Sequence, residues 1–284
     1  MNNSIELADP VFTSDFILNI VRRHAPDAKE VTCVDEQGGS ARAYHIDNRI
    51  TLKVQRPHRV KSEFNIQREV FLLKELEKQG VANVPRTLGY GKQGAFEYNC
   101  MTKIPGLAVR FTELTPEQRA NMLQELGKTL YQIHNIPLQP FYDSSLAWEK
   151  YNNADDIQKR VWHYFGIAIN KMSRKPTQEQ IDDAKAQAGK LICKITGVSV
   201  KIRHADPSDE HTFVKDGNYT GLIDFGDAYI THPAFDLRRW PEADRPALMK
   251  GYLGAGKVED SFLPVCEAIF AVEDILSELK NENK

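Results

Sequence analysis

Cysteine pairs, long apolar runs and an excess of either charge are all missing from this sequence. Its four cysteines, at positions 33, 100, 193 and 266, are too far apart for a CxxC pair. This spacing excludes a zinc ribbon and a CxxC redox motif, and it is typical of reduced thiols in a cytosolic protein. The apolar runs fall far short of the roughly 18–20 residues that span a bilayer, and the first ten residues, MNNSIELADP, contain no apolar signal core. We therefore expect a cytoplasmic protein that does not enter membranes.

The charge balance argues against nucleic acid as a partner. Lysine and arginine total 37, and aspartate and glutamate total 39, which gives a formal net charge of −2 at pH 7. A chain with so little net charge has no broad basic field to attract a phosphate backbone. With 41% hydrophobic residues among 284, the chain is long enough for one large domain or two lobes with a substantial core.

The texture of the sequence changes near Gly106, where we place a lobe boundary. Before it, short strand-like pieces over residues 31–54 and 84–105 flank an amphipathic helix predicted over residues 62–80. After it, the sequence is mostly helical, with an expected hairpin whose turn is DGN. The helices predicted there cover residues 114–136, 144–171, 177–195 and 261–279.

Titratable residues crowd into the stretch RHADPSDEH, residues 203–211. The stretch follows a strand-like run, and the second strand of the expected hairpin ends at Asp224 in IDFGD. This arrangement predicts that Asp206, His211 and Asp224 converge on one pocket. Such a group of anionic and imidazole side chains is costly unless protons or a cation neutralise it. A divalent metal is the simplest cation to expect.

A second set of candidate residues lies upstream. ITLKV places Lys53 inside an apolar strand, and Glu69 follows it in the long helix. A lysine on a strand and a glutamate on the next helix can form a partly buried pair that directs the ammonium toward a polyphosphate. The segment EQGGSAR contains Gly38, Gly39 and Ser40, and its backbone N–H groups can approach phosphates closely.

These pieces together resemble the aminoglycoside phosphotransferases and related small-molecule kinases. The matching stretches run in family order from residue 36 to 237: GGS, LKV, QREV, CMTKIPG, HADPSDEH and GLIDFGDAYITHPAFDL. The resemblance implies an α+β, bilobal protein-kinase-like fold. Residues 1–105 would form a small N-terminal nucleotide-binding lobe, an antiparallel sheet with one long helix and the connector. Residues 106–284 would form a larger, mostly helical C-terminal lobe with the catalytic loop and the acceptor site.

The resemblance also implies roles for the crowded residues. Asp206 would be the catalytic-loop aspartate that accepts or orients the substrate hydroxyl proton, and Asp224 would hold Mg²⁺. His211 stands where most of the family has asparagine, as in the subset that includes macrolide kinases, and would be the second metal ligand. Asp236 would be a buried acid that braces the catalytic loop. Ala205 replaces the usual glycine, which we expect to be a mild change.

The connector between the lobes would contact the nucleotide base. By resemblance, Met101 is the gatekeeper, and the backbone of Thr102 and Ile104 meets the purine edge. The Lys53–Glu69 pair and the glycine-containing segment would hold the phosphates. His204 is expected to support the loop rather than to act in catalysis.

We therefore expect a phosphotransferase that moves the γ-phosphate of ATP or GTP to a hydroxyl of a small molecule, either an antibiotic or a metabolite. Two alternatives stay open at this point. The histidines and aspartates around residue 206 can serve a metal-dependent hydrolase, and the fold can bind nucleotide without turnover. The sequence does not name the acceptor, choose between ATP and GTP, or fix the oligomeric state.

Overall fold

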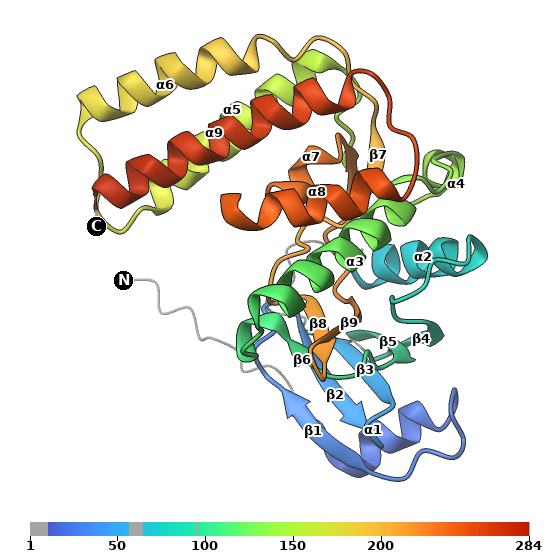
Figure 1. Ribbon diagram of the computed structural model, residues 1–284. Coiled ribbons are helices and arrows are strands. Elements are labelled where there is room, and N and C mark those ends of the chain that lie inside the picture. Colours follow the sequence, from blue (N-terminus) through green and yellow to red (C-terminus); the bar gives the residue numbers. More distant parts are fainter. Residues whose placement is uncertain (1–10, 57–64, 95, 284) are drawn as a thin grey trace, which may run out of the picture.

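The computed structural model describes residues 11–56, 65–94 and 96–283, and it consists of a sheet part and a helical part (Figure 1). The sheet part is an antiparallel sheet with strand order β1-β2-β3-β5-β4. Its strands are β1 (Val31–Asp35), β2 (Ala41–Ile46), β3 (Ile50–Gln55), β4 (Thr87–Gln93) and β5 (Phe96–Thr102). Alternation along β3 places Leu52 on one face and Lys53 on the other.

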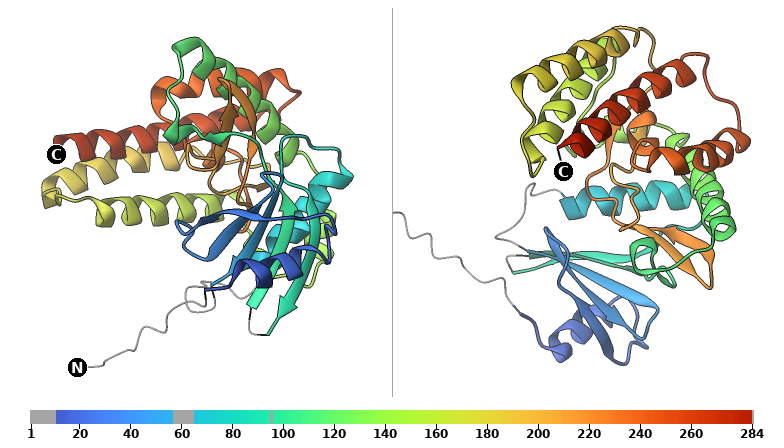
Figure 2. Two further views of the ribbon diagram at one scale, coloured as in Figure 1. Left: turned by 90° about the horizontal axis from the view of Figure 1, so that it is seen from below. Right: turned by 60° about the vertical axis from the view of Figure 1, so that its left-hand side comes forward.

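Two helices cover opposite faces of this sheet. Helix α1 (Ser14–Val21) packs Ile17 and Ile20 against the face that carries Leu52. Helix α2 (Asn65–Lys78) lies on the other face, where Val70 packs with the first residue of β2. Figures 1 and 2 show α2 between the sheet and the helical part. Because α2 and Lys53 share a face, the helix can supply an acid to that lysine.

The helical part is built around the largest hydrophobic core of the chain. Its helices are α3 (Pro116–His134), α4 (Gln139–Asp143), α5 (Ala154–Lys171), α6 (Gln178–Ile192), α7 (Ala234–Leu237), α8 (Arg245–Gly254) and α9 (Phe262–Glu282). Helices α5, α6 and α9 pack side by side (Figure 2). Helices α3 and α8 approach so closely that a Cβ at Gly251 would lie 1.9 Å from the carbonyl oxygen of Gln124. Only glycine fits there.

Three short strand pairings fix the position of residues 203–211, the stretch rich in titratable side chains. Strand β7 (Lys201–Arg203) pairs with β10 (Tyr229–Thr231). Strands β8 (Thr212–Lys215) and β9 (Asn218–Leu222) form the predicted hairpin, and β6 (Leu107–Ala108) pairs with β8. The loop that holds Asp206 and His211 therefore runs from β7 to β8, and Asp224 follows β9.

The helix expected over residues 144–171 begins ten residues later than predicted. Asn153 is the N-cap of α5, and its side chain accepts a hydrogen bond from the Asp156 N–H. The preceding segment uses its backbone elsewhere, because the Tyr151 N–H donates to the Ile230 carbonyl and the Ile230 N–H donates to the Glu149 carbonyl. A backbone engaged with β10 cannot close helical hydrogen bonds.

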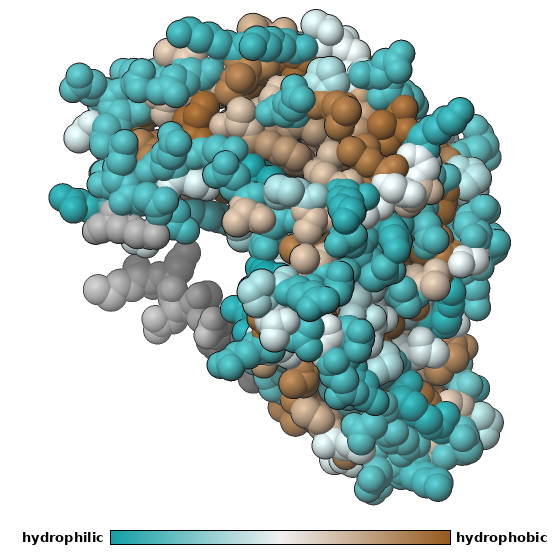
Figure 3. All heavy atoms as spheres, viewed as in Figure 1, coloured by the Kyte–Doolittle hydropathy of each residue, from teal (hydrophilic) through white to brown (hydrophobic). Residues whose placement is uncertain are grey.

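The face drawn in Figure 3 is mostly hydrophilic, with apolar residues gathered over the helical part. The same view shows a hollow on the left-hand side between the helical part and the sheet part. Within residues 11–56, 65–94 and 96–283, no helix is long and apolar enough to cross a membrane.

Candidate active site

Lys53 joins the sheet part to the helical part. Its Nζ donates to Glu69 Oε1 at 2.9 Å and to Asp224 Oδ1 at 2.5 Å. Burial acts to lower the pKa of Lys53, but the two carboxylates outweigh it and leave the pKa raised. The lysine is therefore a fixed cation held between an acid of α2 and an acid of the helical part.

Glu69 is the anchor of this pair. Its carboxylate is fully buried, and Oε1 also accepts a hydrogen bond from the Phe225 N–H at 3.3 Å. Oε2 accepts a longer one, at 3.4 Å, from Asn99 Nδ2 on β5. Both oxygens of this buried carboxylate therefore accept hydrogen bonds, and Oε1 also has the lysine ammonium as a charge partner. Glu69 thereby fixes both the lysine and the backbone beside Asp224.

Asp224 occupies a strained position. Its φ is +70°, in the left-handed region that costs a residue with a Cβ about 1 kcal/mol or more. The conformation turns the side chain back toward Lys53, and the side chain stays 42% exposed. Burial acts to raise the pKa of Asp224, but the Lys53 ammonium, through its charge and its hydrogen bond, outweighs it and holds the pKa well below its usual range. The result is an accessible, ionised carboxylate.

His211 lies between the two predicted aspartates. Its Nδ1 is 2.8 Å from the backbone carbonyl of Asp206, which can only accept, so Nδ1 carries a proton and donates. In the neutral ring Nε2 then carries a lone pair, and Nε2 is 3.5 Å from Asp224 Oδ2. A lone pair and a carboxylate that face each other at this distance form a suitable pair of ligands for a cation.

Asp236 braces the loop before Asp206, as expected. This fully buried acid accepts hydrogen bonds from the backbone N–H groups of His204, at 2.8 Å, and Ala205, at 3.0 Å. Arg203 Nε donates to it at 2.7 Å, and His134 Nε2 lies 3.0 Å away. Burial acts to raise the pKa of Asp236, but Arg203 and His134 outweigh it and keep the acid ionised.

His204 supports the loop from within, which confirms the structural role expected for it. Its Nε2 donates to the Ile223 carbonyl at 2.8 Å, and its Nδ1 accepts from the Asp206 N–H at 3.1 Å. Burial lowers the pKa of His204 to about 4, so the ring is neutral at pH 7. Ala205 has a φ of +88°, which explains the usual glycine and corrects the expectation of a mild change.

Asp206 has a partner that the sequence did not suggest. Arg239 Nε donates to Asp206 Oδ1 at 2.8 Å, and Arg239 Nη2 donates to the same oxygen. Asp206 Oδ2 lies 3.6 Å from His211 Nδ1. The pair of arginines directly after PAFDL could have pointed to this contact. The sequence alone does not show that the short helix α7 directs the second arginine toward the loop.

The remaining predicted residues belong to the sheet part and its connector. The loop between β1 and β2 holds Gly38, Gly39 and Ser40. A Cβ at Gly38 would lie 2.3 Å from the Ala41 carbonyl oxygen, so this bend requires glycine. Met101 is buried at the end of β5, on the same face as Lys53.

The connector leaves two backbone groups for a nucleotide base. The Thr102 N–H already donates to the Arg86 carbonyl at 2.9 Å, so only the Thr102 carbonyl can serve as predicted. Within the described ranges the Ile104 N–H donates to no other residue.

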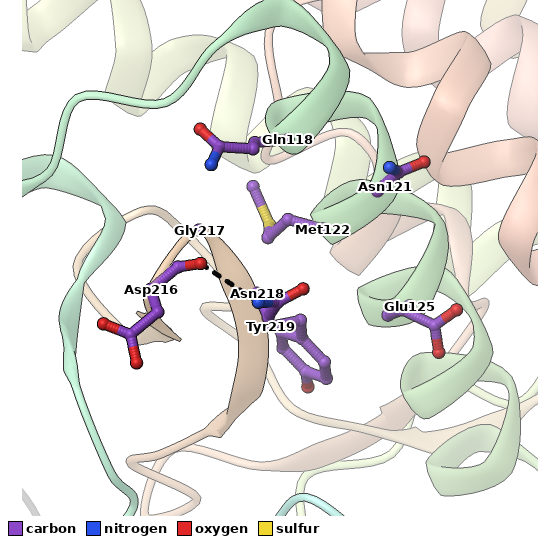
Figure 4. Close-up of a pocket in the computed structure, with 8 residues that line it drawn as sticks. All are labelled: Gln118, Asn121, Met122, Glu125, Asp216, Gly217, Asn218 and Tyr219. Atoms are coloured by element: carbon purple, nitrogen blue, oxygen red, sulfur yellow. Dashed lines mark hydrogen bonds between the residues drawn. The ribbon is translucent and has the colours of Figure 1, made fainter.

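Two cavities open on the helical part. One, of about 430 Å³, lies between α9 and the segment from Arg238 to Arg245, and Arg239 lines it. The other, of about 260 Å³, lies between α3 and the β8–β9 turn (Figure 4). There, Gln118 faces the turn at Asp216 and Asn218. None of the predicted site residues lines this second cavity.

A two-part fold with a lysine, a glutamate and aspartates meeting between the parts is that of a kinase-like phosphotransferase, and solved structures of this class superpose on the chain. The GDP complex of wild-type aminoglycoside 2'-phosphotransferase-IIIa matches with a TM-score of 0.68 and 15% identity, over 96% of this chain and 100% of that one. Macrolide 2'-phosphotransferase MphH from Brachybacterium faecium matches at 0.62 with 14% identity, over 92% and 89%. Spectinomycin phosphotransferase APH(9)-Ia, in complex with ADP and spectinomycin, matches at 0.60 with 16% identity, over 94% and 88%.

The chain belongs to the phosphotransferase enzyme family, whose model matches residues 33–264. No curated protein sequence matches it. The predicted α+β, bilobal kinase-like fold is confirmed, and so is the resemblance to the family.

Proposed function

We propose that this protein transfers the γ-phosphoryl group of ATP or GTP to a hydroxyl of a small molecule. The observation that carries the proposal is the position of Lys53 Nζ, within 2.9 Å of Glu69 and 2.5 Å of Asp224. His211 extends the same cluster to Asp206. Phosphoryl transfer depends on positioning and charge neutralisation, which a fixed cation and ionised carboxylates supply.

The nucleotide would lie against the sheet part. Lys53, held by Glu69, would bind phosphate oxygens, and the loop of Gly38, Gly39 and Ser40 would cover them with backbone N–H groups. Met101 would line the base pocket. The Thr102 carbonyl and the Ile104 N–H would hydrogen-bond the purine edge, which gives the connector its role.

Asp206 would orient the acceptor hydroxyl and take its proton. In the reaction, the acceptor oxygen forms a bond to the γ-phosphorus, the bond from that phosphorus to the β-phosphate oxygen breaks, and the hydroxyl proton passes to the carboxylate. The bracing of the loop by Asp236 and His204 supports this role, because a base must be held within hydrogen-bond reach of its proton.

The residues present fit Mg²⁺ between His211 and Asp224. The His211 lone pair faces the Asp224 carboxylate at 3.5 Å, and phosphate oxygens and waters would complete the oxygen-rich shell that Mg²⁺ prefers. Bound there, the metal ion would neutralise charge on the phosphate oxygens. A histidine ligand is less suited to Mg²⁺ than the usual asparagine, which bears on metal preference.

The acceptor would enter from the helical part. The 430 Å³ cavity is lined by Arg239, which contacts Asp206, and its volume suits a small molecule. The names of the similar structures make aminoglycosides, macrolides and spectinomycin the first compounds to test. We propose residues 1–105 as the nucleotide-binding lobe and residues 106–284 as the lobe for catalysis and acceptor, acting in the cytoplasm where both nucleotides are present.

The test is a nucleotide-consumption screen of the purified protein with Mg²⁺, ATP or GTP, and a panel of aminoglycosides, macrolides and hydroxyl metabolites. The proposal expects consumption that depends on one compound class and stops on chelation of the metal. Tight binding of nucleotide with no turnover for any compound would favour a binding module. Stoichiometric zinc or iron in the purified protein, with hydrolase activity, would favour a metal hydrolase.

A further inference from the structure

Arg239 engages one oxygen of the proposed base completely. Its Nε and Nη2 both donate to Asp206 Oδ1, which uses both lone pairs of that oxygen. The other oxygen, Oδ2, is on the side of His211, 3.6 Å from Nδ1. A hydroxyl that must donate to Oδ1 therefore competes directly with a guanidinium.

The ion pair between Arg239 and Asp206 can be broken at little cost. Arg239 and Asp206 have side chains that are 36% and 35% exposed, and ion pairs exposed to this degree contribute little to stability. Two nearby arginines are fixed instead. Arg203 is buried against Asp236, and Arg238 lies over the Tyr164 ring at 4.0 Å. Of these three arginines, Arg239 is the one that can leave its partner at small cost.

Arg239 lies between the 430 Å³ cavity and Asp206, because it lines the cavity and its guanidinium contacts the carboxylate. Arg239 and Trp240 both line the cavity, and the Trp240 indole donates to the Pro207 carbonyl at 2.7 Å, which fixes the wall to the catalytic loop. A molecule that fills the cavity and presents a hydroxyl to Asp206 must therefore move the guanidinium aside. Water alone fills no such volume and gains no contacts that would offset the lost ion pair.

We propose that Arg239 is a positioning residue that withholds the Oδ1 oxygen of Asp206 from water until an acceptor displaces its guanidinium. The inference rests on the proposed function. In the wasteful reaction, the water oxygen joins the γ-phosphorus, the bond to the β-phosphate oxygen breaks, and the water proton passes to the carboxylate of Asp206. With Oδ1 occupied, the water has no free lone pair there to orient it. Arg239 thereby limits nucleotide loss in the absence of an acceptor.

Phosphate release without any acceptor tests this directly, with Mg²⁺ and ATP or GTP as the only additions. We expect Arg239→Ala to raise kcat for hydrolysis about tenfold, a part of the roughly 10²–10⁴-fold that a positioned base contributes. The nucleotide KM and the melting temperature stay at wild-type values. The double variant Arg239→Ala/Asp206→Asn loses the rise, and Arg239→Lys restores part of the restraint.

Arg110→Ala is the matched control. Arg110 pairs with Glu210 of the same loop at 2.5 Å and similar exposure, but it does not touch Asp206, so its removal leaves hydrolysis unchanged. Hydrolysis that stays flat or falls in Arg239→Ala overturns the proposal, and so does a rise that survives in the double variant. The proposed function fails separately, when no compound of the panel accepts phosphate from the wild-type protein.

Discussion

Lys53 and Asp224 are 171 residues apart in the chain, yet Lys53 Nζ lies 2.5 Å from Asp224 Oδ1. One belongs to a strand of the sheet part and the other follows a hairpin of the helical part. Their contact closes the two parts on one site, and Glu69 fixes it through both Lys53 and the Phe225 N–H.

Lys53→Met separates the catalytic from the structural role of this cation. Removal of the lysine leaves the buried Glu69 carboxylate without its charge partner, which costs about 3 kcal/mol of unfolding free energy. The double variant Lys53→Met/Glu69→Gln recovers much of that stability because it removes the buried charge. Both variants lose nucleotide consumption by a factor on the order of 100. Urea unfolding and turnover assays measure the two effects, and a double variant that regains activity along with stability would refute a phosphate-binding role.

We expect His211 to set the preference for the metal. Because imidazole favours later transition metals and Mg²⁺ favours oxygen, His211→Asn lowers the ratio of nucleotide consumption with Co²⁺ to that with Mg²⁺. It keeps activity with Mg²⁺, whereas His211→Leu loses activity with both metals. An unchanged ratio in His211→Asn would show that this side chain does not bind the metal.

The buried His204 makes stability depend on pH. Its pKa is lowered by burial to about 4 in the folded protein, so between pH 6.5 and pH 4 the unfolded chain binds a proton that the folded chain does not. Stability is therefore lost as the pH falls, by about 2 kcal/mol from this ring at pH 5. Urea unfolding at pH 7 and pH 5 should show a smaller difference for His204→Gln than for wild type. The exposed His163→Gln variant serves as the control, and an equal difference in His204→Gln would contradict the account.

Ala205→Gly should stabilise the protein. The φ of +88° strains a residue with a Cβ, and relief of that strain yields about 1 kcal/mol, or roughly 2–4 °C in Tm. Ala188→Gly in the interior of α6 should destabilise by about 1 kcal/mol or more, because glycine there costs backbone entropy and removes a buried methyl group. Calorimetry that finds the same sign for both variants would contradict the strain at residue 205.

Much of this site could be predicted from the sequence because its parts are local motifs in a fixed order. Each motif can be assigned to its element from nearby residues alone. The lysine lies in an apolar strand, the acid lies in the next helix, and the titratable bend precedes a hairpin. Helix α3 was predicted from Thr115, Pro116 and Gln118, and the structure has the full capping box.

The features that the sequence did not predict depend on contacts between segments far apart in the chain. Residues 144–153 have helical composition, but the backbone of Glu149 and Tyr151 hydrogen-bonds to Ile230 of β10 instead. Arg239 reaches Asp206 only because α7 turns the chain over the loop between β7 and β8. Neither contact leaves a spacing pattern in the sequence, since both are set by tertiary packing.

We expect Asp206 to perform the chemistry beside a nucleotide that other residues hold. The most direct measurement compares Asp206→Asn with wild type in two assays: titration with Mg²⁺ and a fluorescent nucleotide, and transfer of the γ-phosphate to an accepted compound. The account predicts a nucleotide Kd within about threefold of wild type and a transfer rate lower by roughly 10²–10⁴-fold, the contribution of a positioned base. A variant that transfers phosphate at the wild-type rate would contradict it.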